Sequence, residues 1–418
     1  MNKKTDSMED IMGRPREDIN NIAREQIRDL HAHGLIDLNV NPRQSFHLDT
    51  TKIAYHRERV AAWQRGERVA PITIDMALTQ KCSFACTFCY AGLQQNPSSP
   101  VSWETYETFL EDCVEIGHAK GEGVRAISLV SDGESTENPN YYRFLLKGRE
   151  HGIDMALGTN GFKISPEEIP GLVNSLTYLR FNFNAADPNA YAQIMGTSEK
   201  NYSSVVQTIR DFVRIKKEQK SNITIGLQMV LLPEYADQVI PVALLGRELG
   251  VDYTVVKHCS DDESGRLGVD YSWYKSEFAI ELLRAAEALS TPKYSVQAKW
   301  SKMLTGRDRK YARCYGTPLL LQMSGTGIVA PCGSFFHEKY SRYHIGHIEE
   351  TRFKDIWASE EYMEVVNYLA SEQFDARRQC ATLCLQDKVN EVLYDLVEQN
   401  IPLPDVTGKS PPMHSNFI

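Results

Sequence analysis

From residue 72 onward, short apolar runs alternate with longer amphipathic stretches, and this alternation constrains the fold more than any other feature of the chain. The apolar runs predict six strands, at 72–79, 126–131, 154–160, 178–184, 223–231 and 252–257. The stretches between them predict helices, most clearly at 102–121 and 203–219. Because strands separated by helices pair in parallel through right-handed crossovers, we expect an α/β fold. Either an open doubly wound sheet or an incomplete barrel fits, and both place ligands at the carboxyl ends of the strands.

Two segments flank the alternation. Residues 21–36 predict an amphipathic helix, and a second helical pattern follows around residues 55–66. From about residue 300 the alternation is lost and a second group of cysteines begins. We therefore expect a short helical extension at 1–71, the strand and helix domain at 72–295, and a C-terminal α+β domain at 296–418.

The composition indicates where the protein resides, and this limits what the nine cysteines can do. The polar N-terminus shows no secretory signal, and no run of about 18 apolar residues indicates a membrane span. We therefore expect a cytoplasmic protein without a membrane partner, in a compartment where disulfides are rare and clustered thiols bind metals or catalyse reactions. The net charge of −9, with no long basic run, does not favour binding along a nucleic acid duplex.

Three cysteines lie within the stretch TQKCSFACTFCYA, directly after the first predicted strand, with the spacing C-x3-C-x2-C. A structural zinc site needs four ligands, and no nearby residue completes this one. A 4Fe-4S cluster held by Cys82, Cys86 and Cys89 keeps one iron free for a small molecule. An incomplete zinc knuckle or three buried thiols are the alternatives. With Phe88 and Tyr90 around the third cysteine, the stretch resembles the signature of the radical S-adenosylmethionine (SAM) superfamily.

The resemblance covers roughly residues 72–260 and implies a partial (β/α)6 TIM-like barrel that binds SAM at its mouth. The segment after the second strand resembles the family's Gly-Glu motif, which receives the SAM amino group, although Ser135 replaces the commoner proline; its residues are Ser131, Asp132, Gly133 and Glu134. Polar residues near the same mouth would contact the SAM ribose and carboxylate: Thr159, Asn160, Asn182, Asn184 and Gln228. Lys257, on the sixth strand, is a candidate catalytic residue. Ordinary polar residues at strand ends are the alternative for each.

The resemblance also implies the chemistry. The free iron would chelate the amine and carboxylate of SAM, and an electron from the cluster would cleave the bond between sulfur and C5′. The 5′-deoxyadenosyl radical would then take a hydrogen atom from a substrate. An electron donor such as flavodoxin or ferredoxin would supply the electron.

The second group of cysteines is Cys314, Cys332, Cys380 and Cys384. Gly325 and Gly327 predict a hairpin that returns the chain toward Cys314. Four such thiols fit a zinc site or a fully ligated 4Fe-4S cluster, with buried thiols as a third alternative. Together with residues 344–357, the arrangement resembles the SPASM and twitch domains of radical SAM enzymes. The full SPASM pattern has more cysteines and two auxiliary clusters, so we expect one auxiliary 4Fe-4S cluster here.

Two cysteines remain. Cys113 falls on the apolar side of a predicted helix and is interpreted as a core residue. Cys259 follows the sixth strand, and if that strand continues, Cys259 shares a face with Lys257 at the barrel mouth. There a thiol could return a hydrogen atom to a product radical, as in an epimerase or isomerase, although a buried thiol without a role is the simpler alternative. The neighbouring His258, Asp261, Asp262 and Glu263 would bind a polar substrate or form a solvated loop.

Four functions compete. The first is a radical SAM oxidoreductase or isomerase that dehydrogenates, epimerises or isomerises a small polar substrate, such as a sugar, aminosugar, cyclitol or nucleotide conjugate. The second is a maturase of ribosomally made precursor peptides, for which residues 1–71 look too short to hold the usual leader-recognition domain. The third modifies an amino-acid-decorated nucleobase in bacteriophage DNA, which the negative charge disfavours. The fourth is an iron-sulfur sensor or scaffold without enzymatic activity. We expect the first.

Overall fold

The computed structural model describes residues 13–36, 50–93, 100–117, 122–262, 264–305, 308–382, 384 and 386–418. Within these residues ten strands form one curved sheet, in the order β10-β9-β8-β1-β2-β3-β4-β5-β6-β7. All strands from β8 across to β7 are parallel, and β9 and β10 add antiparallel at one edge. The strands are β1 Thr73–Met76, β2 Ala126–Leu129, β3 Asp154–Thr159, β4 Leu176–Asn182, β5 Thr224–Leu231, β6 Tyr253–His258, β7 Ser295–Ala298, β8 Leu320–Met323, β9 Ile328–Ala330 and β10 Gly346–His347.

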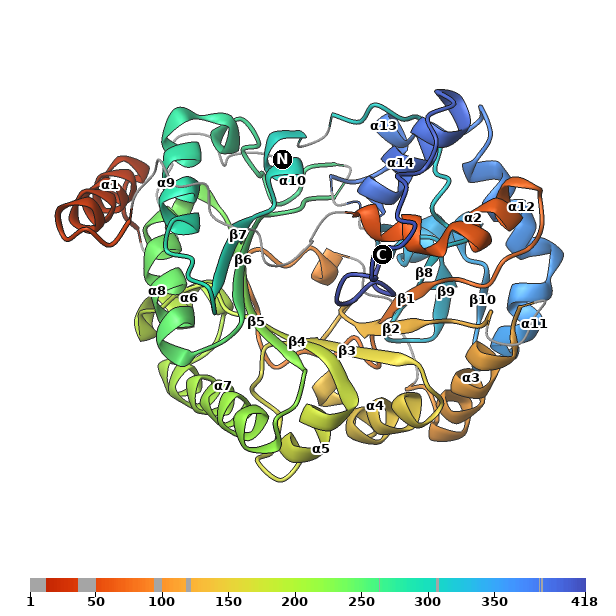
Figure 1. Ribbon diagram of the computed structural model, residues 1–418, viewed down its shortest axis with the longest axis horizontal. Coiled ribbons are helices and arrows are strands. Elements are labelled where there is room, and N and C mark those ends of the chain that lie inside the picture. The colour runs from red at the N-terminus through yellow and green to blue at the C-terminus, as the bar shows by residue number, and fades with distance from the viewer. Residues whose placement is uncertain are drawn as a thin grey trace.

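Helices cover the outer side of the curve, so the molecule is an open α/β barrel (Figure 1). These helices are α3 Trp103–Glu115, α4 Tyr141–Glu150, α5 Ile169–Ser175, α6 Pro188–Met195, α7 Glu199–Gln219, α8 Val239–Leu249 and α9 Glu277–Glu287. The six predicted strands and the helices predicted at 102–121 and 203–219 are confirmed, although α3 already ends at Glu115. Part of the predicted helix, residues 118–121, lies outside the described residues.

Two further strands extend the predicted six-stranded unit. β7 spans residue 295, where we expected the barrel domain to end, and β8 from the expected C-terminal domain pairs with β1 in parallel. The β7 sequence SVQA alternates small and polar residues over four positions, so it lacks the apolar run by which we recognised the other strands. The barrel therefore takes its eighth parallel strand from a segment that lies beyond the first cysteine of the second group.

The two faces of the sheet differ in chemistry. Outward side chains such as Ile127, Leu157 and Leu179 are fully buried beneath the helices. The alternate positions point to the inner face, and there most side chains are polar: Asp75, Ser128, Arg180, Asn182, Gln228, Lys257, Gln297 and Gln322. Because sheets of parallel strands are usually apolar on both faces, a polar inner face indicates an interior that holds a polar ligand or water.

The N-terminal elements pack on the outside of the barrel. α1 Arg16–Ala32 buries Ile19, Ala23 and Ile27 against α8, α9 and the short helix η4 Pro233–Gln238. An ion pair of 2.7 Å between Arg16 and Glu234 adds to this contact. The helix predicted at 21–36 is thus confirmed with earlier bounds, and the second helical pattern corresponds to η1 Thr50–His56 and α2 Arg57–Gln64.

The C-terminal region begins with α10 Trp300–Thr305 and the β8–β9 hairpin, which confirms the hairpin predicted from Gly325 and Gly327. It continues through α11 Phe353–Ala358, α12 Glu360–Leu369, α13 Ala376–Gln379 and α14 Asp387–Glu398. Short 3-10 turns complete the described elements: η2 Ala91–Leu93, η3 Ser135–Glu137, η5 Trp273–Lys275, η6 Gly333–Phe335 and η7 Glu338–Tyr343. None of the helices in the described ranges has the length and apolarity that crossing a bilayer requires.

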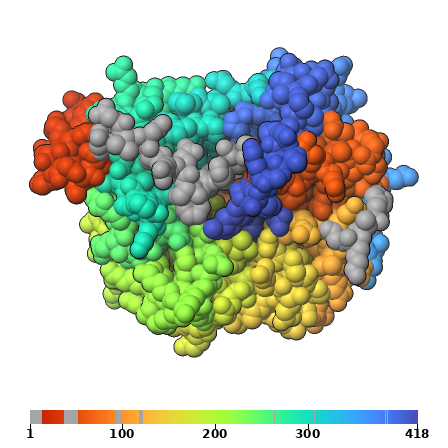
Figure 2. All heavy atoms as spheres, in the orientation of Figure 1, coloured from red at the N-terminus to blue at the C-terminus, as the bar shows by residue number. Residues whose placement is uncertain are grey.

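Residues 413–418 close the barrel at the amino ends of its strands, and Figures 1 and 2 show this dark blue segment over the centre of the ring. Phe417 packs against Tyr178 at a ring distance of 4.9 Å and contacts Ala126 and Ala156. The Asn416 amide donates to Asp154 at 2.7 Å, and Lys52 donates to the Phe417 carbonyl oxygen at 3.0 Å. A ligand therefore has to enter the barrel from the opposite end.

We expect Phe417→Ala to lower the free energy of unfolding by about 3 kcal/mol, because it removes a buried aromatic ring that the surrounding residues cannot replace. The midpoint of urea denaturation measures this effect. Ile401→Ala, which truncates an exposed apolar side chain, is the control and should change stability by no more than about 0.5 kcal/mol. Equal effects of the two variants would show that the tail does not close the barrel in solution.

Candidate active site

The three clustered cysteines lie on an irregular loop that follows β1 at the carboxyl end of the barrel. Cys82 and Cys89 are exposed and Cys86 is half-buried. The loop is held by the end of α6, where the Ala85 amide donates to the Gly196 carbonyl oxygen at 3.1 Å. Gly196 has a φ of +58°, and a Cβ there would lie 2.1 Å from the Ala85 carbonyl oxygen, so only glycine permits this close approach. The loop thus presents its thiols at the barrel mouth.

Glu134 links the ends of β2 and β3. Its carboxylate accepts hydrogen bonds from the Thr159 hydroxyl at 2.8 Å and from the Asn160 amide N–H at 2.7 Å, and further ones from Thr136. Burial raises the pKa of Glu134, and these hydrogen bonds oppose the shift. The Asn160 side chain in turn donates to the Ser83 hydroxyl at 3.5 Å, within the cysteine loop. The fold therefore brings the expected SAM-contacting residues Glu134, Thr159 and Asn160 together beside that loop.

The other residues of the Gly-Glu motif, Ser131 to Gly133, connect the segments that form the barrel mouth. Asp132 accepts from the Gln80 amide and from the Gly325 backbone N–H, each at 2.8 Å, and so ties the cysteine loop to the β8–β9 hairpin. Burial raises the pKa of Asp132 to about 6. Gly133 has a φ of +74°, and a Cβ there would lie 2.1 Å from the Thr79 carbonyl oxygen. The half-buried Ser131 connects this turn to β2, and half-buried Tyr90 follows the third cysteine.

The expected polar residues of β4 and β5 have different surroundings. Gln228 donates to the Asn182 side chain at 2.9 Å, and its own carbonyl oxygen is buried without a hydrogen-bond partner. Asn184 is fully buried and pairs with the backbone of Val230, donating to its carbonyl oxygen at 2.7 Å. Gln228 and Asn182 therefore have hydrogen-bonding capacity toward a ligand, whereas Asn184 holds the ends of β4 and β5 together.

Cys259 lies at the mouth, beside the cysteine loop. Its backbone N–H donates to the Leu231 carbonyl oxygen at 3.1 Å, which continues the ladder beyond β6 and puts Cys259 on the same face as Lys257. Its thiol lies 3.7 Å from the Phe88 carbonyl oxygen, next to Cys89. Burial raises the pKa of Cys259 to about 12, so the thiol stays protonated at neutral pH. Burial lowers the pKa of Lys257 to about 7, with a smaller contribution from Arg180.

The residues after Cys259 form a tight turn. His258 is buried with its ring against the Cys259 carbonyl oxygen at 2.7 Å, and burial lowers its pKa to about 4. The Asp261 carboxylate accepts from the backbone N–H groups of Asp262 and Leu267, at 2.8 and 2.9 Å. Asp261 and Asp262 are both buried rather than solvated. Glu263, the last of the polar neighbours of Cys259, lies outside the described residues.

The second group of cysteines converges from three segments of the C-terminal region. All four thiol residues line one small cavity of about 20 Å³, whose other walls include Phe335, Leu369 and Phe374. Arg309 binds the backbone carbonyl of Ala376 at 3.0 Å and that of Ala381, and Lys302 binds the Cys384 carbonyl at 2.9 Å. Four thiols with two cations beside them suit an anionic iron-sulfur cluster in an apolar surrounding. Cys113, by contrast, is fully buried in the α3 core, as predicted.

Sequence reasoning missed several inner-face residues: Asp75, Arg180, Lys299 and Gln322. The alternation that pointed Asn182 and Asn184 to one face also includes Arg180, so period two within β4 was sufficient to find it. Lys299 directly follows β7 and Gln322 lies in β8, so neither could be placed before those strands were recognised.

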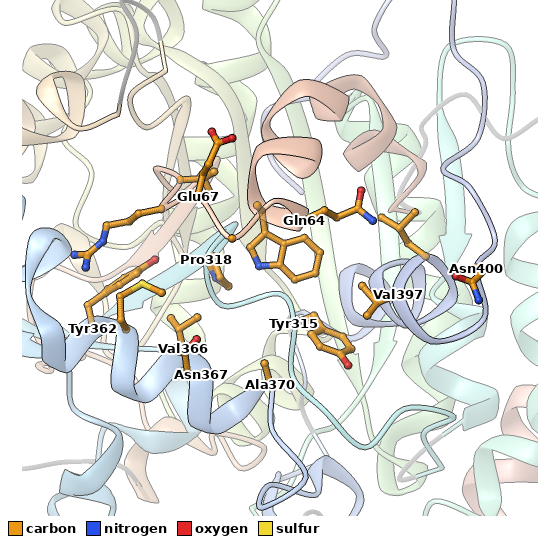
Figure 3. Close-up of a pocket in the computed structure, with 16 residues that line it drawn as sticks. Gln64, Glu67, Tyr315, Pro318, Tyr362, Val366, Asn367, Ala370, Val397 and Asn400 are labelled. Atoms are coloured by element: carbon orange, nitrogen blue, oxygen red, sulfur yellow. The ribbon is translucent and has the colours of Figure 1, made fainter.

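A separate groove of about 440 Å³ lies between α2, α12 and α14, on the outside of the barrel. Figure 3 shows Tyr315, Tyr362 and Glu67 around it. The Tyr315 N–H donates to the Asn390 side chain of α14 at 2.7 Å, and Tyr315 directly follows Cys314 of the second group. None of the expected site residues lines it.

Comparison with known protein families shows which domains the chain carries. Residues 76–241 match the Radical SAM superfamily, and residues 314–385 match SPASM, an iron-sulfur cluster-binding domain. The chain therefore carries a radical SAM domain followed by a SPASM domain, which confirms the resemblance drawn from its motifs.

Individual relatives are distant. The chain is 24% identical to an AdoMet-dependent heme synthase of Methanosarcina barkeri, over 70% of this chain and 83% of that protein. It is also 24% identical to a probable GTP 3′,8-cyclase of Thermococcus kodakarensis, over 37% of this chain and 48% of that protein. Among solved structures, Streptococcus suis SuiB bound to S-adenosylmethionine is 14% identical with a TM-score of 0.55, covering 75% of this chain and 72% of SuiB. This likeness shows the fold alone.

The chain is thus a radical SAM enzyme, whose domains imply a SAM-binding 4Fe-4S cluster and auxiliary iron-sulfur binding. The residues present fit these groups, because three thiols lie on one loop at the mouth and four line one cavity. Within the described ranges, no three His, Cys, Asp or Glu side chains are close enough to hold a single metal ion.

Proposed function

We propose that this enzyme cleaves SAM reductively, takes a hydrogen atom from a small polar substrate, and returns one from Cys259, giving epimerisation or isomerisation. The substrate class is a sugar, aminosugar, cyclitol or nucleotide conjugate. The observation that carries the proposal is the position of the Cys259 thiol, 3.7 Å from the Phe88 carbonyl oxygen in the cysteine loop. A hydrogen-atom donor has to be protonated and close to the site of the radical. The raised pKa of the buried thiol and its contact with the cysteine loop support this role.

When bound, the cluster and SAM supply a 5′-deoxyadenosyl radical at the barrel mouth. Cys82, Cys86 and Cys89 would hold the cluster. Glu134 would accept from the SAM amino group, since Thr159 and Asn160 fix its carboxylate in position. The inner polar face would position one C–H bond of the substrate, and near-attack geometry would then govern the rate.

The hydrogen balance defines what Cys259 has to do. The substrate would lose one hydrogen atom to the 5′-deoxyadenosyl radical, which becomes 5′-deoxyadenosine. The rearranged or inverted substrate radical would then take one from the Cys259 S–H bond. The sulfur radical left behind needs one electron and one proton to restore the thiol. A ferredoxin or flavodoxin would supply the electron, and SAM would be consumed in each turnover. The same need for reductant and for reduced thiols supports a cytoplasmic location.

The test uses the anaerobically reconstituted protein with dithionite and SAM in D₂O, against a library of sugars, aminosugars, cyclitols and sugar nucleotides. We expect 5′-deoxyadenosine and a product carrying one solvent deuterium, because the S–H hydrogen exchanges with solvent. Cys259→Ala should still form 5′-deoxyadenosine but give a product without that deuterium. Cys113→Ala, which removes a thiol from the core, should behave as wild type. Unchanged deuterium in Cys259→Ala would refute the role of this thiol.

A precursor peptide is the second candidate substrate. A structure of SuiB bound to the precursor peptide SuiA is 15% identical to this chain with a TM-score of 0.54, covering 79% of this chain and 74% of SuiB. That likeness supports a shared fold and leaves the substrate open to the same test, with peptides added to the library.

A further inference from the structure

Three basic side chains gather on the inner face of the barrel. Arg180 comes from β4, Lys257 from β6, and Lys299 from the position after β7. Ala298 pairs with Val256, so Lys299 and Lys257 occupy neighbouring positions on adjacent parallel strands. Burial is the main cause that lowers the pKa of Lys257 and of Lys299. Repulsion from Lys302 and Arg180 adds to both shifts, and repulsion from Lys257 adds to that of Lys299. The three charges are therefore close enough to affect one another.

These cations form no hydrogen bond or ion pair in the described part of the chain, and Asp75 acts on Arg180 and Lys299 only at longer range. The Arg180 Nε is buried without a hydrogen-bond partner there. Two other lysines near the interior do have hydrogen-bond partners. Lys302 donates to the Cys384 carbonyl at 2.9 Å, and Lys52 donates to the Phe417 carbonyl at 3.0 Å. The lack of partners thus distinguishes these three residues from the other two cations.

One carboxylate faces the same interior. Asp75 of β1 forms no ion pair within 4.0 Å in the described residues, and burial raises its pKa to about 6. Partly buried cations that repel one another cost free energy unless an anion neutralises them. Arg180, Lys257 and Lys299 face this one carboxylate, and Lys302 adds positive charge at longer range, so the interior favours a bound anion. A phosphate dianion would neutralise more of this charge than a single carboxylate.

The surroundings provide further contacts for such a ligand. The Gln228 carbonyl oxygen and the Gln322 amide nitrogen are both buried on this face without hydrogen-bond partners. Buried polar atoms of this kind are normally satisfied, so a ligand or water is expected there. Because residues 413–418 close the far end, the ligand has to approach from the cysteine loop.

We propose that Arg180, Lys257 and Lys299 form an anion subsite that binds the phosphate of a phosphorylated sugar or nucleoside substrate. This inference rests on the proposed function and narrows its substrate class. A guanidinium can bind two phosphate oxygens side by side, and the two ammonium groups add point charges. Neutral sugars and cyclitols would lack this contact.

The test is calorimetric binding to the reconstituted holoprotein without dithionite, so that SAM cleavage plays no part. The probes are UMP, inorganic pyrophosphate and, as the uncharged counterpart, uridine. We expect UMP and pyrophosphate to bind and uridine to bind at least tenfold more weakly. Arg180→Gln and Lys299→Gln should each weaken UMP binding by about tenfold or more, since each removes a charged hydrogen bond. Arg180→Lys should recover part of the loss.

Lys293→Gln is the matched control, because it removes an exposed lysine six positions before Lys299 and should leave UMP binding unchanged. Equal binding of UMP and uridine, or equal effects of Lys293→Gln and Lys299→Gln, would overturn the subsite. If Arg180→Gln or Lys299→Gln lost SAM binding while UMP binding stayed unchanged, the subsite would also be overturned, because the cations would then be assigned to the SAM carboxylate. Binding of a short DNA duplex without binding of UMP would also overturn it. UMP binding in a protein that forms no 5′-deoxyadenosine would support the subsite and refute the proposed function.

Discussion

Cys82→Ala is expected to abolish 5′-deoxyadenosine formation from SAM and dithionite, and to remove about half of the iron bound after reconstitution. The loop supplies only three thiols for a cluster, and no fourth cysteine lies beside it in the sequence to take the place of the lost ligand. Two thiolates do not hold a 4Fe-4S cluster firmly, and without the cluster there is no electron to cleave SAM. Mass spectrometry of 5′-deoxyadenosine and an iron assay measure the two effects.

Cys113→Ala is the matched control, because it makes the same chemical change at a fully buried thiol of α3. It should retain all of the iron and the activity, at a stability cost of about 1 kcal/mol. Retention of 5′-deoxyadenosine formation in Cys82→Ala would contradict the assignment of this loop. Loss of iron in Cys113→Ala would show that the iron assay reports folding rather than ligation.

Cys332→Ala should have the second largest effect, with loss of the other half of the iron while 5′-deoxyadenosine formation is retained. The four thiols of the second group come from residues 314, 332, 380 and 384, and they line one cavity. The Cys314 thiol donates to the Gln386 side chain at 3.4 Å and accepts from the Asn390 amide of α14 at 3.5 Å. Ligation therefore contributes directly to the folding of this region. We expect the melting temperature of the variant to fall by several degrees, together with loss of turnover on substrate.

Two measurements check this prediction: separate iron and zinc analysis, and thermal melting followed by circular dichroism. Cys113→Ala is a suitable control, since it makes the same chemical change at a fully buried thiol outside the second group and keeps all four of its thiols. Loss of zinc rather than iron from Cys332→Ala would rule out an auxiliary iron-sulfur cluster. An unchanged metal content would show that these thiols are structural.

Much of the site could be predicted because its signals are local. The spacing of Cys82, Cys86 and Cys89 forces three thiols onto one loop, and the polar residues after β2 and β3 reach the same edge because parallel strands end there. The contacts of Glu134 with Thr159 and Asn160 follow from that rule. Asn184 shows where this rule fails. It points inward like a ligand-binding residue, but its side chain donates a hydrogen bond to the backbone of the next strand instead.

Sequence by itself determined the periodic elements and the two groups of thiols, because hydrophobic period and cysteine spacing act over a few residues. Only the tertiary structure decided that β8 pairs with β1, that residues 413–418 close the barrel, and that Arg180, Lys257 and Lys299 share one interior. The physical reason is that strand order and barrel closure depend on which surfaces bury one another across the whole chain. The positions of those three charges, which come from three different strands or strand ends, follow from that closure.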